Sequence, residues 1–168
     1  MSIDSANVLA ELRRVANPTN VAGMGRFGIA GQDLLGISAV KLRAIAKRTG
    51  RNHSLAKKLW TSRIFEALIL AAVVAEPAQL TRQQANAWAK DFECWADCDG
   101  LCIQLFRKTP FAHELAVAWS GPRQRSRNVF WSFSMFRPHQ RSEEAEMPTH
   151  AAAGFRLAFG VIMAHFCA

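Results

Sequence analysis

The chain has 168 residues, half of them hydrophobic, and a formal net charge of +8 at pH 7. A chain of this length and composition buries one sizeable core, which excludes disorder over most of its length and favours a single globular domain. Neither a signal-peptide pattern nor an apolar run of roughly 18 residues is present, so we expect a cytoplasmic protein with no membrane partner. The excess of positive charge favours acidic partners, with nucleic acid as the first class to test.

The first third of the chain is predicted to form two helices separated by a connector. Apolar residues at helical spacing predict a helix over residues 5–15, which Asn17-Pro18 ends. We expect a connector over residues 20–30 and a glycine-bounded turn over residues 31–36. Ser38 then caps the next helix, whose lysines and arginines face outward. The residues expected on its inner face are Val40, Leu42, Ile45 and Ala46.

The middle of the chain is predicted to contain the centre of the core. After a break at residues 50–52, Leu55, Leu59 and Trp60 form the apolar stripe of a short helix. Residues 64–74 then form a helix that is apolar almost all round. A helix with that pattern is buried on every side, so we expect it to be central.

Further helices follow up to residue 120. Pro77 ends the central helix, and Thr81 starts the next one. Its buried side continues through Trp88, Phe92 and Trp95. Further turns over residues 101–106 lead to a last helix over residues 111–119. No alternating strand of convincing length precedes Gly121, so the pattern predicts an all-α stack of antiparallel helix pairs, although no strict sequence period is visible.

The composition changes at Gly121. Residues 121–150 combine clustered arginines, aromatic residues and prolines with few aliphatic residues, so burial poorly offsets the entropy lost on ordering them. Residues 151–168 return to an apolar, helix-like pattern. We therefore predict a helical domain over residues 1–120 and an atypical segment over residues 121–168, either poorly ordered or read from a shifted frame.

The cysteines are better explained as reduced thiols than as a disulfide framework. They are Cys94, Cys98, Cys102 and Cys167. The first three follow one another at intervals of four residues and lie on one helical face, whereas metal sites usually take ligands from loops or paired elements. We therefore predict a buried apolar stripe and no bound metal.

Trp95 and Asp99 form the most informative pair of residues. An indole and a carboxylate four residues apart in a helix lie on one face. The ring quadrupole and the carboxylate both favour positive charge, so the pair suits a cationic ligand. The structural alternatives are a tryptophan packed in the core and a carboxylate that caps the helix or faces solvent. Asp97 faces elsewhere and is expected in solvent.

Basic residues on the predicted helices are candidates for phosphate contacts. Charged residues usually do no more than solvate a helix face, but in a stacked-helix fold they also line a concave surface and bind phosphates without reading sequence. We predict phosphate contacts for Arg43 and Lys47 and include Arg26 among the DNA-binding residues.

Four stretches, taken in order and with their spacing, resemble the AlkD-type DNA alkylation repair glycosylases, a bacterial family built of HEAT-like helical repeats. The residues that carry the likeness lie in 21–29 (with Arg26-Phe27), 35–38 and the helix after it, 59–71 (with Glu66-Ala67) and 88–112 (with Trp95 and Cys98-Asp99). The resemblance covers about the first 120 residues.

The resemblance implies a HEAT-like helical repeat stack, an α-α superhelix, that releases cationic N3- or N7-alkylated purines from duplex DNA. It implies neither a cofactor nor an obligate protein partner. Trp95 and Asp99 match the catalytic tryptophan and aspartate of the family. Phe27 stands where the family often has tyrosine, so its stacking surface for DNA is kept and a hydroxyl group is missing.

The likeness stops after Trp119-Ser120, where the family continues with a basic, aromatic helix and a catalytic-site arginine. The resemblance therefore implies a repeat stack truncated on its carboxy-terminal side, with glycosylase activity either kept or lost with that segment. The alternatives are a non-catalytic basic helical-repeat module that binds DNA or another acidic partner, and a purely structural helical scaffold.

Overall fold

A computed structural model describes residues 4–29 and 33–119, which all belong to one compact unit. Every regular element in these residues is a helix, and the one β-type contact among them is an isolated bridge between Asp33 and Ile64. The all-α prediction is confirmed for this part of the chain. The prediction for residues 121–168 lies outside the described residues.

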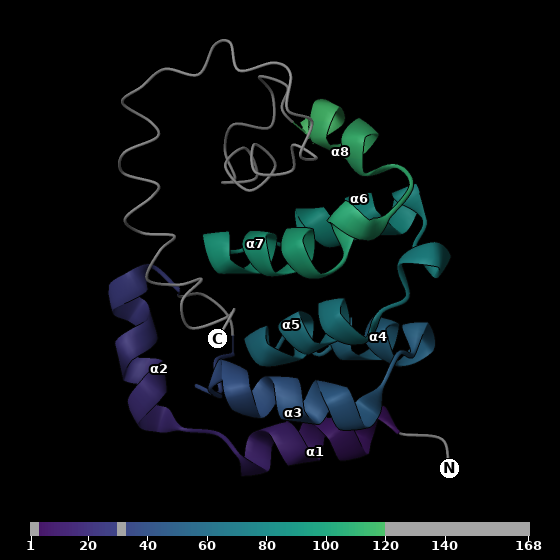
Figure 1. Cartoon of the computed structure of the whole chain (residues 1–168). Helices are drawn as coiled ribbons and strands as arrows, with labels where there is room; N and C mark the ends of the chain where they lie inside the picture. The colour runs from purple at the N-terminus through teal and green to yellow at the C-terminus, as the bar shows by residue number, and fades with distance from the viewer. Residues whose placement is uncertain (1–3, 30–32, 120–168) are drawn as a thin grey trace. The chain divides into compact units, whose positions relative to one another are not determined.

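The helices stack in layers, with one helix set apart from the others. Figure 1 shows α1 below α3, α4 beside α5, α6 beside α7, and α2 upright at one edge of the stack. The α-helices are α1 (Ser5–Arg14), α2 (Pro18–Met24), α3 (Ala39–Thr49), α4 (His53–Trp60), α5 (Phe65–Val74), α6 (Arg82–Lys90), α7 (Trp95–Gln104) and α8 (Ala112–Trp119). The short 3-10 helices are η1 (Gly25–Phe27), η2 (Pro77–Gln79) and η3 (Phe106–Lys108).

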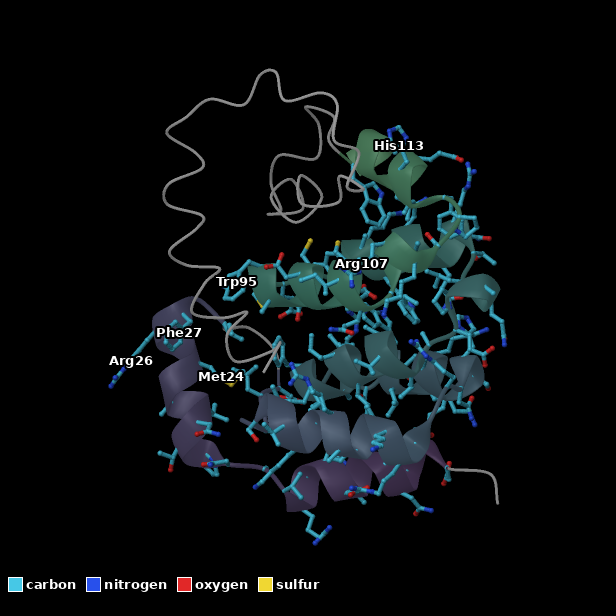
Figure 2. The ribbon with its side chains drawn as sticks, viewed as in Figure 1. Met24, Arg26, Phe27, Trp95, Arg107 and His113 are labelled. Carbon is cyan, nitrogen blue, oxygen red and sulfur yellow. The ribbon has the colours of Figure 1, made fainter. Side chains whose placement is uncertain are left out.

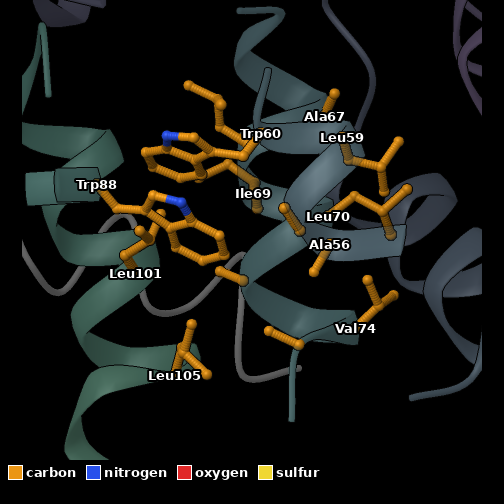
Figure 3. Close-up of a cluster of buried hydrophobic side chains, with 14 of the residues drawn as sticks. Ala56, Leu59, Trp60, Ala67, Ile69, Leu70, Val74, Trp88, Leu101 and Leu105 are labelled. Carbon is orange, nitrogen blue, oxygen red and sulfur yellow. The ribbon is translucent and has the colours of Figure 1, made fainter. Parts of the chain in front are cut away.

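The core is centred on α5, as its sequence predicts. This helix packs against α1, α3, α4 and α7, and all its residues except Phe65 and Val73 are buried. On its α7 side, the rings of Trp60 and Trp88 stack with centroids 4.4 Å apart (Figure 3). Burial of several large side chains here stabilises the fold by roughly 1.5–3 kcal/mol for each one.

Helices α3 and α5 run parallel. The residues just before α3 contact the start of α5, since the N–H of Phe65 donates to the carbonyl of Asp33 over 3.0 Å. The residues just after α3 contact its end, since the N–H of Asn52 donates to the carbonyl of Val74 over 2.7 Å. The starts of α3 and α5 therefore lie at one edge of the stack, on the side of α2 (Figure 1).

The predicted connector over residues 20–30 is wrong, because most of it is helical. Asn17 is the N-cap of α2, its side-chain oxygen accepts the N–H groups of Thr19 and Asn20, and Pro18 is the first helical residue. Asn-Pro is a signal both for the end of one helix and for the start of another. Here it marks the start, and α1 has already ended at Arg14.

Two other expectations about single elements are also wrong. Val40 is 71% exposed and does not lie on the inner face of α3. It lies two residues from Leu42, and two residues turn a helix by about 200°, which places them on opposite faces. Residues 101–104 continue α7 rather than forming turns.

The expected burial of Trp60 and Trp88 is confirmed. The predicted cysteine stripe is confirmed for Cys98 and Cys102, which are buried with their Sγ atoms 3.9 Å apart, but not for Cys94, which is only partly buried. None of the helices in the described residues is long and apolar enough to span a bilayer.

Candidate functional site

Trp95 lies where α7 meets the end of η1. It is the first residue of α7, and its indole N–H donates a 2.8 Å hydrogen bond to the backbone carbonyl of Phe27 (Figure 2). The indole of Trp95 is half-buried, while the Phe27 side chain is 61% exposed. Two of the predicted site residues, 68 positions apart in the chain, therefore lie together.

The start of α7 is fixed by a capping box. Cys94 is the N-cap, and the carboxylate of Asp97 accepts the backbone N–H groups of Glu93 and Cys94 over 3.0 and 3.1 Å. Asp97 is fully buried, so the expectation that it faces solvent is wrong. A carboxylate at this position turns back to satisfy N–H groups at the start of its helix, which favours burial over solvation.

The surroundings of Cys94, the N-cap of α7, do not favour a reactive thiolate. Burial, together with the neighbouring charge of Asp97, raises the pKa of the Cys94 thiol to about 11. The group is therefore a neutral thiol at physiological pH, and a thiol is a weak nucleophile.

The loop that precedes Trp95 is also held at its other end. Asp91 follows α6, and its carboxylate accepts the indole N–H of Trp60 over 2.8 Å. The same carboxylate forms an ion pair with Arg63 at 3.0 Å. Because Asp91 and Asp97 are anchored on either side, the backbone that presents Trp95 has little freedom.

Asp99 follows Trp95 by one helical turn, on the same face of α7. Its carboxylate is half-buried, and burial raises its pKa to about 6. Within the described residues it has no hydrogen bond and no ion pair. At neutral pH it is therefore largely ionised but poorly solvated, a state that favours interaction with a cation.

Two helices approach each other closely at the residue after Asp99. A Cβ placed on Gly100 would lie 2.4 Å from Cδ1 of Ile69, so the end of the Ile69 side chain would have to shift to admit any other residue. Glycine thus lets α7 pack directly on α5. Trp95 and Asp99 both belong to α7, so the packing of α7 on α5 fixes the position of the helix that carries them.

The predicted cationic residues lie on two separate elements. Arg26 belongs to η1, next to Phe27, and its exposed side chain points away from the helices (Figure 2). Arg43 and Lys47 both lie on α3, half-buried and exposed respectively. Lys47 is in the last turn of α3, away from the edge where α3 begins. The structure therefore does not place Lys47 beside Trp95.

Glu66 is a residue whose role the sequence reasoning missed. It is 1% exposed and its carboxylate accepts three backbone N–H groups from residues 35–37. The available signal was a carboxylate inside a helix that is otherwise apolar, because a buried charge requires partners.

Among the described residues, no group of three or more His, Cys, Asp or Glu is arranged to hold a metal ion.

A family model and a solved structure match this chain. The model of the DNA alkylation repair enzyme family matches residues 8–125. The solved structure belongs to "a new family of proteins related to the HEAT-like repeat DNA glycosylases with affinity for branched DNA structures". It is similar with a TM-score of 0.70 at 17% sequence identity, over 95% of this chain and 68% of the other.

The two matches answer different questions. At this identity the structural likeness shows the fold, and it confirms the HEAT-like helical repeat architecture. No curated protein matches the sequence. The family model covers more than half of the chain, including Phe27, Trp95 and Asp99. On that match, the chain belongs to the DNA alkylation repair enzyme family.

Proposed function

We propose that the protein is a DNA glycosylase that releases cationic N3- or N7-alkylated purines from duplex DNA, with Trp95 and Asp99 as its catalytic residues. The observation that carries the proposal is the pairing of the half-buried Trp95 indole with a half-buried Asp99 carboxylate that has no ion pair within the described residues. The indole N–H is already used by Phe27, so the π face of the ring is what Trp95 offers a ligand.

Charge explains how this pair would act. An alkylated purine is a cation, so cleavage of the glycosidic bond returns the bonding electrons to the base and moves positive charge onto the sugar. The indole face would bind the cationic base and, as cleavage proceeds, would also stabilise the positive charge that develops on the adjoining sugar. The Asp99 carboxylate stabilises the oxocarbenium-like sugar and orients the water that adds to it, accepting a proton from that water.

Binding to the duplex is assigned to residues around this pair. Arg26 stands beside Phe27, and an exposed aromatic side chain offers a surface for contact with bases or sugars. Arg43 and Lys47 on α3 would contact phosphates farther along the duplex. Contacts of this kind give affinity with little sequence preference.

The alternative is a basic module that binds DNA without chemistry. The structurally similar protein has affinity for branched DNA, and this favours testing a junction as well as a linear duplex. A module of this kind would prefer the junction and would release no base from either substrate.

Base release separates the two functions. We would incubate the protein with duplex DNA that contains N7-methylguanine or N3-methyladenine and measure the free base. Asp99→Asn and Trp95→Ala should abolish most of the release, while Glu93→Gln, which changes an exposed carboxylate near Trp95, should not. If the parent protein binds DNA but releases no base from either substrate, the glycosylase proposal is wrong and the binding module replaces it.

A further inference from the structure

The two short helices that lead to Phe27, α2 and η1, contain no buried residue. The chain leaves the core at Asn17 and returns at Leu35, where the N–H of Asn17 donates to the carbonyl of Leu35 over 2.7 Å. We call residues 17–29 and 33–35 the excursion. Since α2 and η1 contain no buried residue, we expect the position of these two helices to depend on polar contacts at the base and the tip of the excursion.

Glu66 holds the base of the excursion. Its carboxylate accepts the backbone N–H groups of Leu35 (2.9 Å), Gly36 (2.6 Å) and Ile37 (3.3 Å). Hydrogen bonds to an ionised group are about twice as strong as neutral ones, and burial strengthens them further. Glu66 lies at the start of α5, so the returning chain is tied to the most buried helix of the fold.

Gly36 connects the residues held by Glu66 to the start of α2. Its carbonyl accepts the side-chain N–H of Asn20 over 2.8 Å. A Cβ on Gly36 would lie 2.2 Å from the carbonyl oxygen of Asn17, and φ at Gly36 is +68°, a conformation that favours glycine. The start of α2 therefore lies directly against the peptide that Glu66 holds. The tip of the excursion ends at Phe27, whose carbonyl receives the Trp95 indole N–H.

We propose that Glu66 is a positioning residue for the candidate site, acting through Gly36 and α2 to hold the Phe27 carbonyl where it fixes the Trp95 indole. The use of that indole in base release rests on the proposed function, but the mechanical link does not. The exchange rate of the Trp95 indole N–H therefore reports whether the contacts at the base of the excursion are intact.

Hydrogen exchange of the Trp95 indole N–H, measured by NMR, tests the link, and Trp95→Phe identifies the resonance. Glu66→Gln removes the charge and turns an amide donor toward the N–H groups of residues 35–37. Asn20→Ala removes the hydrogen bond from the Asn20 side chain to the Gly36 carbonyl and leaves the Glu66 carboxylate unchanged. In both variants the Trp95 indole N–H should exchange at least about tenfold faster than in the parent protein, while the backbone amides of α5 stay as protected as in the parent protein.

Gly36→Ala and Gly50→Ala form a matched pair. Both glycines have positive φ, but a Cβ on Gly50 meets nothing within 4 Å, whereas one on Gly36 meets Asn17. Gly36→Ala should accelerate exchange of the Trp95 indole N–H, and Gly50→Ala should not. Affinity for duplex DNA should fall in Glu66→Gln and Asn20→Ala without a change in its salt dependence, because no phosphate contact is removed.

The outcomes separate this inference from the proposed function. Unchanged indole exchange in Asn20→Ala and Gly36→Ala, with both proteins folded, would overturn the positioning role even if Glu66→Gln failed to fold. Equal acceleration by Gly50→Ala would also overturn it, because the effect would then be general destabilisation. If the indole N–H exchanges faster in the variants but the parent protein releases no base, the positioning role stands and the glycosylase proposal is refuted.

Discussion

The indole N–H of Trp95 donates to the main-chain carbonyl of Phe27, not to any side chain. Every residue type has a backbone carbonyl, so the two aromatic residues depend on each other unequally. Replacing the Phe27 ring leaves the hydrogen bond in place. Replacing the Trp95 indole removes it.

This inequality predicts opposite results for two variants. Phe27→Ala should weaken duplex binding by removing an exposed ring, while the exchange rate of the Trp95 indole N–H stays as in the parent protein. Thermal unfolding should change little, because the side chain is 61% exposed. Trp95→Phe should keep an aromatic face yet lower base release, since the ring loses the bond that orients it. Faster indole exchange in Phe27→Ala would contradict the backbone assignment.

The carboxylate of Asp99 should give base release a characteristic pH dependence. Its pKa is raised to about 6 by burial, and the ionised form is the one that stabilises a cationic sugar. Release should therefore fall as the pH drops below about 6. Asp99→Asn should lower release by roughly a hundredfold and lose this acidic limb, with duplex affinity nearly unchanged. A parent profile flat from about pH 5 to about pH 8 would count against the assignment.

Asp99 should also cost the protein stability at neutral pH. Its pKa in the folded protein lies above the ordinary value of 3.8, so the folded state binds the proton more tightly than the unfolded state. Its favourable contribution is complete below the unfolded pKa and is lost as the pH rises through about 6. Asp99→Asn should therefore raise the melting temperature at about pH 7.5 and leave it close to the parent value near pH 4. A lower melting temperature at the higher pH would show that the ionised carboxylate is stabilising.

The contact of Gly100 with Ile69 predicts a sign reversal in a double-mutant cycle. Gly100→Ala places a Cβ 2.4 Å from Cδ1 of Ile69 and should destabilise the fold by about 1–3 kcal/mol. Ile69→Val removes that methyl group, at a cost of about 1 kcal/mol alone. In the Ile69→Val background, Gly100→Ala should become neutral or stabilising, since alanine is preferred to glycine in a helix by ~1 kcal/mol. Denaturant unfolding of the four proteins measures the coupling, and simple additivity would refute the proposed contact.

Salt dependence tests the cationic residues. Arg26→Gln and Lys47→Gln should each reduce the slope of log affinity against log salt by about 0.9, the contribution of one phosphate contact. Arg82→Gln is the matched control, because Arg82 is paired with Glu114 on α8 and lies over the ring of Phe111. An equal loss of slope in all three variants would mean that charge in general, rather than these positions, attracts DNA.

The features that the sequence determined are those whose cause lies within one or two helical turns. The apolar pattern of residues 64–74 predicts the buried α5, because a helix surrounded by other helices has no polar side. The spacing of Trp95 and Asp99 places them on one face once α7 forms. Asn17-Pro18 failed as a signal because the same two residues suit the end and the beginning of a helix.

The tertiary structure alone decided which residues meet. Trp95 contacts a carbonyl 68 positions away, and Glu66 contacts amides about 30 positions away. Backbone carbonyl and N–H groups are the same in nearly every residue, so no side-chain pattern marks the partner that such a group will find. Only the packing of α7 on α5, and of the excursion on Glu66, brings these groups within hydrogen-bonding distance.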